Sequence, residues 1–221
     1  ATNVGDGAVS GVTHIPLDHT DLLGDTVEDI AREKAGIIKR GGFLVSAAQP
    51  RGAAQVLLEK AREVGVPHRF EGVEFGVESR SLAVGGQLVT VRGLAGRYKD
   101  LAVPLHGAHQ AENAAVAVAA LEAFLGGGER ELSVDVLREG FAEVSSPGRL
   151  ETVRTSPTII VDAAHNPDGI RVSAQALKEA FDFSTLVIVL GVLREKDAEA
   201  ILRTLEEEFA EERVEYCFTQ S

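Results

Sequence analysis

The side chains of this sequence that could carry out chemistry begin with the imidazole of His19 and the amine of Lys34. His19 lies in a loop with Asp18 and Asp21, shortly after Val9–Ile15, whose composition is typical of a strand. Open α/β sheets bind their ligands just beyond the carboxyl ends of their strands, so this loop is a candidate site. A lone loop histidine can equally be a surface residue or a capping partner.

Lys34 lies in the helix that is expected to follow this loop. Thr26 and Asp29 form a capping-box pattern at the start of that helix. Its apolar positions are Val27, Ile30, Ala31 and Ile38. Helical periodicity places Lys34 on the same face. The lysine either buries its stem and keeps the ammonium in water, or it is partly desolvated, which favours the neutral, nucleophilic amine. In the second case carbon dioxide could convert it to a carbamate, and the carbamate could share a divalent cation with His19.

The run from Leu17 to Lys39, LDHTDLLGDTVEDIAREKAGIIK, resembles the metal-binding stretch of the folylpolyglutamate synthase and dihydrofolate synthase family. This family belongs to the Mur ligase superfamily of ATP-dependent amide-forming enzymes. Its D-H-T/V-D histidine binds magnesium, and the lysine of its E-K-A-G motif is carbamylated. The resemblance therefore implies Mg²⁺ binding by His19 and by the carbamate of Lys34, and a catalytic role for both.

The composition argues against several classes of protein. The net charge of −12 argues against a general nucleic-acid surface, which needs clustered Lys and Arg. No apolar run approaches the roughly 18 to 20 residues of a membrane helix, and the first residues do not resemble a signal peptide. Cys217 is the only cysteine, which agrees with a reducing cytoplasm. The sequence has no methionine and begins at Ala1 without a capping signal, so we expect a piece of a longer cytoplasmic protein.

Strand-like and helix-like segments alternate along the first half of the chain. Phe43–Ala47 is expected to be a strand and Arg51–Val64 an amphipathic helix. With the preceding strand and helix, they give the alternation of a parallel α/β sheet. Three further segments show a period of two and predict a small antiparallel sheet. These segments are Val73–Val77, Leu88–Arg92 and Leu101–Leu105.

Asn113 precedes a helix, Ala114 to Phe124, that is apolar on nearly every side and is therefore expected to be buried. The asparagine could serve only to satisfy backbone amides at the helix start. The Mur-type H-x-x-x-N-A pattern, which begins here at His109, instead implies that Asn113 contacts the nucleotide of ATP.

A domain boundary is expected at Ser145–Gly148, where proline and glycine interrupt the helical pattern and a new alternation of strand and helix begins. It divides the chain into 1–146 and 147–221. Arg149 follows at once. An arginine at this place could form an ordinary surface ion pair, but the family's P-G-R-x-E segment uses it on the bound nucleotide.

Asp162 and His165 follow the segment Thr158–Val161, which is expected to be a buried strand, and they precede a helix opened by Pro167. This position suits a ligand site. Structural capping by Asp162 is the alternative. The resemblance to the family's D-x-A-H-N-P motif implies that Asp162 contacts the nucleotide and that His165 lies close to the phosphates.

The resemblance implies an α/β fold. Residues 1–146 would be the C-terminal part of a Mur-ligase central ATP-binding domain, and 147–221 an incomplete Rossmann-like C-terminal domain. The implied reaction is ligation of L-glutamate to folate or dihydropteroate through an acyl phosphate, with ATP and Mg²⁺. No G-x-x-x-x-G-K-[ST] phosphate loop occurs, so the chain alone is expected to have little or no ligase activity.

Two other functions stay open at this point. One is another Mur-type ligase, such as a peptidoglycan-precursor enzyme, and the other is a non-catalytic nucleotide-binding or interaction module. We expect no nucleic-acid or membrane partner. A monomer is the working expectation, although the sequence leaves the oligomeric state open.

Overall fold

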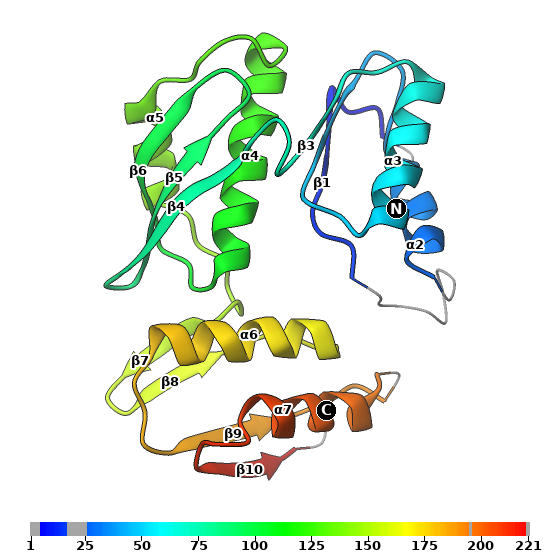
Figure 1. Ribbon diagram of the computed structural model, residues 1–221. Helices are drawn as coiled ribbons and strands as arrows, with labels where there is room; N and C mark the ends of the chain where they lie inside the picture. Colours follow the sequence, from blue (N-terminus) through cyan, green and yellow to red (C-terminus); the bar gives the residue numbers. More distant parts are fainter. Residues whose placement is uncertain (1–4, 17–25, 195, 220–221) are drawn as a thin grey trace. The chain divides into compact units, whose positions relative to one another are not determined.

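The computed structural model describes residues 5–16, 26–194 and 196–219. The chain folds into two compact units, whose elements are labelled in Figure 1. The first unit comprises Ala1–Ser81, Leu88–Val103 and Gln110–Glu143. The second comprises Leu82–Gln87, Pro104–His109 and Val144–Ser221.

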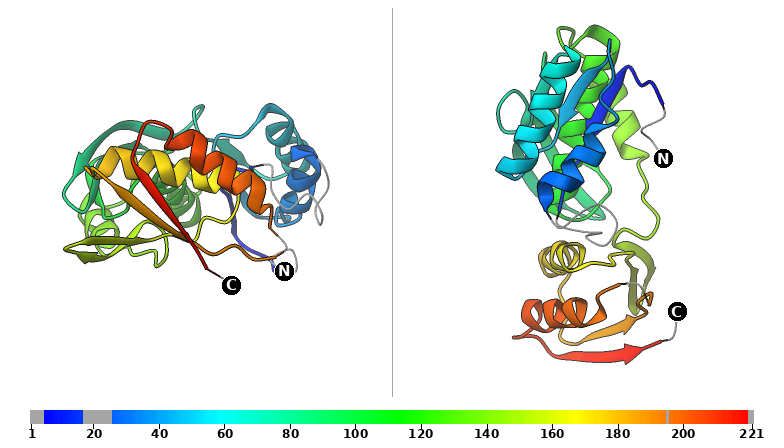
Figure 2. Two further views of the ribbon diagram at one scale, coloured as in Figure 1. Left: turned by 90° about the horizontal axis from the view of Figure 1, so that it is seen from below. Right: turned by 90° about the vertical axis from the view of Figure 1, so that its right-hand side faces the viewer.

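A parallel sheet with the strand order β1-β2-β3 begins the first unit. Its strands are β1 (Val9–Val12), β2 (Phe43–Ser46) and β3 (His68–Phe70), and its helices are α2 (Val27–Ala35) and α3 (Arg51–Val64). The two helices lie side by side in Figures 1 and 2 and share one hydrophobic core with the sheet. Leu44 and Leu57 are fully buried in this core. The expected strand and helix alternation is therefore confirmed, although β1 is shorter than expected and β3 was not expected.

The start of α2 confirms that Thr26 caps the helix, as the capping-box pattern predicted. The Thr26 hydroxyl oxygen accepts from the backbone N–H of Asp29 at 3.2 Å, and the same hydroxyl donates to the Asp29 carboxylate at 2.6 Å. The first bond satisfies one of the backbone donors that the first turn of a helix leaves without an intrahelical partner, and the second holds the two side chains of the cap together. These bonds fix where α2 begins, and with it the position of Lys34 two turns later.

The remainder of the first unit is built around a small sheet and a long helix. The sheet has the order β4-β5-β6. Its strands are β4 (Gly76–Ala83), β5 (Gly86–Arg92) and β6 (Arg97–Val103), and the helices are α4 (Ala108–Gly126) and α5 (Val134–Ala142). A two-residue turn with Gly85 at φ +77° joins β4 to β5, as the tight hairpins of antiparallel strands require.

The burial of α4 differs from the expectation. Leu121, Phe124 and Leu125 are 41 to 64% exposed, so the helix is not buried on every side. Glu122 on the same helix is fully buried. The prediction that these positions are buried was wrong, because an apolar pattern does not show which face of the helix a neighbouring element covers.

A hydrogen-bonded cage surrounds Glu122. Its carboxylate accepts from the backbone N–H groups of Leu94, Ala95 (3.2 Å) and Gly96 (2.9 Å), and from the hydroxyl of Tyr98 (2.6 Å). The Tyr98 oxygen in turn accepts from Leu132 N at 2.8 Å. Burial and the bond to Glu122 raise the pKa of Tyr98 to about 12. This cage ties the β5–β6 turn to α4 and closes the unit.

The second unit contains two two-stranded sheets. Antiparallel β7 (Glu151–Thr155) and β8 (Thr158–Val161) form one, and parallel β9 (Leu186–Leu190) and β10 (Val214–Phe218) form the other. The helices α6 (Pro167–Ala180) and α7 (Ala198–Glu208) pack against the β9–β10 sheet through the core that contains Ile170, Ile201 and Leu205. Asn166 caps α6, and Pro167 opens the helix as expected.

The expectation of a buried strand at β8 was wrong. Ile159 and Val161 are 42% and 44% exposed, because within the described residues β8 pairs only with β7. An apolar run can indicate a strand, but burial depends on what packs over it.

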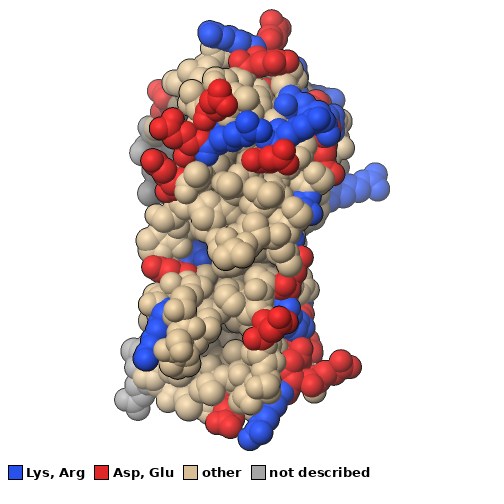
Figure 3. All heavy atoms as spheres, turned by 90° about the vertical axis from the view of Figure 1, so that its left-hand side faces the viewer, with Lys and Arg blue, Asp and Glu red and all other residues tan. Residues whose placement is uncertain are grey.

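Acidic and basic side chains both occur on the face shown in Figure 3, and areas without charged side chains separate them. Arg97 and Glu78 form an exposed ion pair, with 2.5 Å between Nε and Oε2. Among the described residues, no helix is long and apolar enough to cross a membrane.

Candidate nucleotide and metal site

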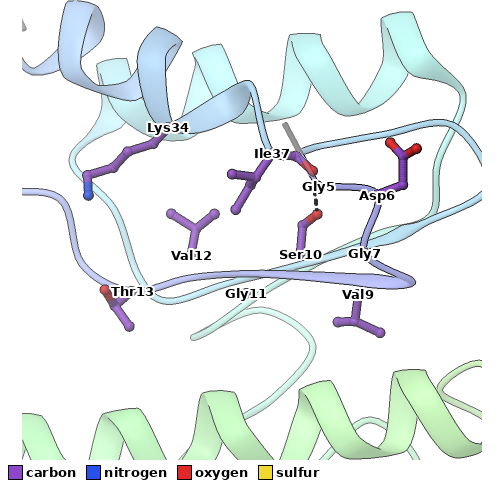
Figure 4. Close-up of a pocket in the computed structure, with 10 residues that line it drawn as sticks. All are labelled: Gly5, Asp6, Gly7, Val9, Ser10, Gly11, Val12, Thr13, Lys34 and Ile37. Carbon is purple, nitrogen blue, oxygen red and sulfur yellow. Dashed lines mark hydrogen bonds between the residues drawn. The ribbon is translucent and has the colours of Figure 1, made fainter. Parts of the chain in front are cut away.

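Lys34 lines a pocket of about 590 Å³ in the first unit, drawn in Figure 4. The pocket lies between the end of α2 and β1, and Asp6, Ser10 and Thr13 contribute its polar groups. The Ser10 hydroxyl donates to the carbonyl of Ile37 at 2.9 Å, which joins the strand to the segment after α2. In Figure 4 the Lys34 side chain extends from α2 toward the end of β1, above Val12 and Thr13.

The exposure of Lys34 corrects the idea that its amine is desolvated. Helical periodicity correctly placed the side chain on the face that α2 turns toward β1, beside Ile30 and Ala31. Those two residues are buried, but Lys34 is exposed because its part of the face lines an open pocket. The lysine is therefore accessible to a small reagent such as carbon dioxide.

Only one of the two metal ligands expected from the sequence lies among the described residues. His19 lies outside the described residues, and Lys34 is within them. Within the described ranges, no cluster of three His, Cys, Asp or Glu side chains could hold a metal ion. The described residues alone therefore do not complete a magnesium site, and the pairing of His19 with Lys34 stays a prediction.

Gln49 at the end of β2 was missed by the sequence reasoning. Its Nε2 donates to the carbonyl of Thr13 at 2.9 Å, and its Oε1 accepts from the backbone N–H of Ile15 at 2.9 Å. The Gln49 side chain thus makes the backbone hydrogen bonds that a neighbouring strand would make to the residues after β1. Its position just after a parallel strand was the signal that could have identified it.

Glu71, which follows β3, is a second missed residue at this edge of the sheet. Its Oε2 accepts from the backbone N–H of Ala48 at 3.1 Å. Burial raises the pKa of the Glu71 carboxyl, and the nearby charge of Glu112 raises it further. A partly buried carboxyl therefore lies where the parallel strands end.

Asn113 lies near the start of α4 and is exposed. Its side-chain Nδ2 donates to Oε1 of Gln110, one helical turn earlier, at 3.2 Å. The first expected helix residue was Ala114, but α4 begins at Ala108, so Asn113 lies inside the helix and is not its cap. The reading of Asn113 as a helix-start residue was therefore wrong.

The second unit brings three of the expected site residues into one loop cluster. Gly148 and Leu150 flank Arg149, and both are bonded to the segment after β8. The carbonyl of Gly148 accepts from Ala163 N at 2.7 Å, and Leu150 N donates to the Asp162 carboxylate at 2.9 Å. Arg149 itself is exposed. The arginine and Asp162, distant in sequence, are therefore neighbours in this loop cluster.

Asp162 also accepts hydrogen bonds from its own loop and from α6. Its Oδ1 accepts from Ala164 N at 2.8 Å and from the Ser173 hydroxyl of α6 at 3.0 Å. Asp162 therefore connects the residue before β7, the loop after β8 and α6, while the N-cap itself is Asn166. His165 is exposed, and its Nδ1 lies 3.0 Å from the carbonyl of Ala163, a bond that orients the ring.

The backbone around Arg149 is unusual. Gly148 has φ +70° and Leu150 has φ +45°, a region that side-chain-bearing residues seldom adopt. Leu150 is held there by burial of its side chain, which is 5% exposed, and by its bond to Asp162. Such conformations persist where the surroundings over-determine them, and they are common at ligand sites.

Comparison with known proteins shows which family these features belong to. Residues 148–219 match the family model described as Mur ligase, glutamate ligase domain. The dihydrofolate synthase/folylpolyglutamate synthase of Mycobacterium tuberculosis is 46% identical over 216 residues, covering 95% of this chain and 44% of that protein. The folylpolyglutamate synthase of Lacticaseibacillus casei is 37% identical over 210 residues, covering 95% and 49%. Residues 148–219 therefore belong to the Mur ligase glutamate ligase domain family, and over 95% of its length the chain is similar to folylpolyglutamate synthases.

Solved structures show the same similarity to folylpolyglutamate synthases. A Mycobacterium tuberculosis folylpolyglutamate synthase complexed with ADP and AMPPCP matches with a TM-score of 0.88 and 45% identity, covering 93% of this chain and 47% of that one. A folylpolyglutamate synthase complex with AMPPCP and folate matches with a TM-score of 0.86 and 38% identity, covering 94% and 50%. The expected family and Mur-ligase fold are confirmed. The chain spans about half the length of the curated relatives it matches.

Proposed function

We propose that this chain is part of an enzyme that ligates L-glutamate to folate or dihydropteroate with ATP. The observation that carries the proposal is the similarity to folylpolyglutamate synthases over 95% of the chain, together with the loop cluster of Arg149, Asp162 and His165. We also propose that the domain boundary lies at 146/147, that the enzyme is cytoplasmic and that it acts as a monomer.

The chemistry explains why such an enzyme needs a phosphate donor. A carboxylate is a poor electrophile, because it is anionic and would have to expel oxide. Transfer of the γ-phosphoryl group of ATP gives an acyl phosphate and ADP. The glutamate amine then attacks the acyl carbon, the amide forms and phosphate leaves. Charge accumulates on the transferred group, so cationic groups and oriented donors lower the barrier.

Each expected site residue has a role in this proposal. Arg149 contacts the bound nucleotide near the transferred phosphoryl group, Asp162 contacts the nucleotide, and His165 lies close to the phosphates. Asn113 contacts the nucleotide of ATP. His19 and the carbamate of Lys34 would hold Mg²⁺, which supplies charge neutralisation at the phosphates when bound. The pocket leaves the Lys34 amine within reach of carbon dioxide, but its exposure removes the desolvation that would favour the neutral, reactive amine, so the carbamate is proposed on the family resemblance alone.

The experiment that tests the proposal compares this chain with a hybrid protein. In the hybrid, this chain replaces the matching part of the Mycobacterium tuberculosis relative. Phosphate release is measured with ATP, Mg²⁺, folate and L-glutamate. We expect the hybrid to turn over and this chain alone to show little or no activity. The variants Lys34→Ala and His19→Ala should inactivate the hybrid, and Lys39→Ala, a basic residue outside the pocket, should leave it active.

Three outcomes would contradict parts of the proposal. Turnover with a muramyl substrate in place of folate would indicate a peptidoglycan-precursor ligase. A hybrid that binds ADP without turnover would indicate a non-catalytic nucleotide-binding module. Enzyme-like rates from this chain alone would refute the expectation that it is inactive by itself.

A further inference from the structure

Carboxylates hold the loop of Arg149 on both sides of the arginine. On one side, Oε2 of Glu151 accepts a hydrogen bond from the backbone N–H of Gly148 at 2.8 Å. On the other side, the carboxylate of Asp162 accepts from the backbone N–H of Leu150 at 2.9 Å. Bonds from an N–H group to a charged carboxylate are among the stronger hydrogen bonds in proteins. The residues next to Arg149 are therefore held in place by acidic side chains.

The backbone of this loop adopts a conformation that needs such support. Gly148 has φ +70° and Leu150 has φ +45°, a region that residues with a side chain disfavour. The N–H of Arg149 between them donates to the carbonyl of Ser146 at 3.1 Å. Each backbone N–H group from Gly148 to Leu150 thus has an acceptor, and the Cα atom of Arg149 has a fixed place in the loop cluster.

The same two carboxylates decide what the Arg149 side chain can bind. Glu151 is two residues away in the chain, and Asp162 binds the residue that follows Arg149, so either carboxylate is a candidate ion-pair partner for the guanidinium. Both are instead engaged by backbone N–H groups. Across the described ranges, no carboxylate pairs with the Arg149 guanidinium, and the residue is exposed. An exposed cation on a fixed backbone is preorganised to bind an anion.

We infer that Glu151 is a positioning residue for Arg149. The inference rests on the proposed function, in which Arg149 contacts the bound nucleotide. Glu151 holds Gly148 in its left-handed conformation, and the bond to Gly148 keeps the Glu151 carboxylate from neutralising the arginine. The backbone of Glu151 is fixed in turn, because Glu151 pairs with Val161 in the β7–β8 sheet. The side chain therefore reaches back to Gly148 from a residue that is itself held in a sheet.

The first test is cleavage of the 221-residue chain by trypsin at the bond between Arg149 and Leu150. Proteases bind the cut segment in an extended conformation, and Leu150 is 5% exposed and left-handed, so this bond is cleaved only after the loop opens. Glu151→Ala should raise the cleavage rate about 3- to 10-fold, because losing one hydrogen bond raises the population of the open loop by that factor. Glu151→Gln keeps an acceptor for Gly148 and should stay within about 2-fold of the unchanged chain.

Two controls separate the loop from general stability. Cleavage after Arg171, inside α6, requires that helix to unfold and reports on the whole second unit. Glu211→Ala removes the same charge at an exposed residue of that unit and should leave both rates unchanged. If Glu151→Ala raises cleavage at Arg149 and Arg171 equally, or leaves cleavage at Arg149 unchanged, the positioning role is refuted. Cleavage of Glu151→Gln as fast as that of Glu151→Ala refutes it as well.

The second test asks whether Glu151 acts on the nucleotide through Arg149. The affinity of the hybrid protein for ADP is measured by calorimetry for Glu151→Ala, for Arg149→Ala and for the double variant. We expect Glu151→Ala to weaken ADP binding about 3- to 10-fold. It should have no further effect once Arg149 is replaced, because the effects of residues in one network are not additive. An equal loss in both backgrounds shows that Glu151 acts independently of Arg149, which overturns the inference.

The two tests distinguish failure of this inference from failure of the proposed function. If Arg149→Ala binds ADP like the unchanged hybrid, or if the unchanged hybrid does not bind ADP, the nucleotide contact of Arg149 is refuted, and the role of Glu151 in binding is refuted with it. The trypsin rates decide independently whether Glu151 holds the loop.

Discussion

Replacing Glu122 with glutamine should strongly destabilise the first unit, although the two side chains have nearly the same shape. All four neighbours of the carboxylate are donors: the N–H groups of Leu94, Ala95 and Gly96, and the Tyr98 hydroxyl. A carboxylate accepts at both oxygens, whereas a glutamine amide accepts at one and donates at the other.

The magnitude follows from the better of the two glutamine orientations. With its oxygen at the Oε1 position, glutamine keeps three bonds in a weaker, neutral form and points its NH₂ group at the N–H of Leu94. A buried donor left without a partner costs about 1 to 3 kcal/mol, and the three remaining bonds lose their charge assistance. We expect Glu122→Gln to lower the free energy of unfolding by about 3 kcal/mol. Glu122→Leu should cost more, because it leaves all four donors without an acceptor.

The assay can be directed at the first unit alone. The chain has no tryptophan and two tyrosines, Tyr98 in the first unit and Tyr216 in the second. In a Tyr216→Phe background, urea unfolding followed by tyrosine fluorescence reports on the surroundings of Tyr98. Glu129→Gln, at an exposed glutamate just beyond the same helix, is the matched control and should change stability by no more than about 0.5 kcal/mol. If the urea midpoint of Glu122→Gln equals that of Glu129→Gln, the cage around Glu122 does not stabilise the first unit.

The remaining predictions concern Tyr98 and the start of α6. Because the folded state holds the pKa of Tyr98 at about 12, above its ordinary value of 10, the stability that Tyr98 contributes is complete below pH 10 and is lost as the pH rises toward 12. Tyrosinate absorbance in the Tyr216→Phe variant should show ionisation well above pH 10, and ionisation of folded Tyr98 at pH 10 would contradict the raised pKa. Asn166→Ala should destabilise the second unit by about 1 kcal/mol, because Asn166 Oδ1 accepts from Gly169 N at 2.7 Å at the start of α6. Tyr216 fluorescence in a Tyr98→Phe background measures this loss, and an unchanged midpoint would show that the cap adds nothing.

The sequence contained most of what specifies the local elements. The Thr26 box marked the start of α2, Pro167 marked the start of α6, and α3 spans the residues that its periodicity indicated. These features could be predicted because capping and periodicity act between residues a few positions apart, whose spacing is explicit in the sequence. The family motifs predicted Arg149, Asp162 and His165 as site residues, and the structure brings them into one loop cluster.

Only the tertiary structure decided which side chains are buried and which distant residues meet. Lys34 lies on the face that the helical period indicated, yet it is exposed, because that face borders a pocket and not a packed layer. Glu122 lies in the apolar helix α4 and is fully buried, because the turn between β5 and β6 supplies hydrogen-bond donors for its carboxylate. Arg149 and Asp162 are neighbours because Leu150 binds the Asp162 carboxylate. Such contacts depend on how separate elements pack, and sequence periodicity describes one element at a time.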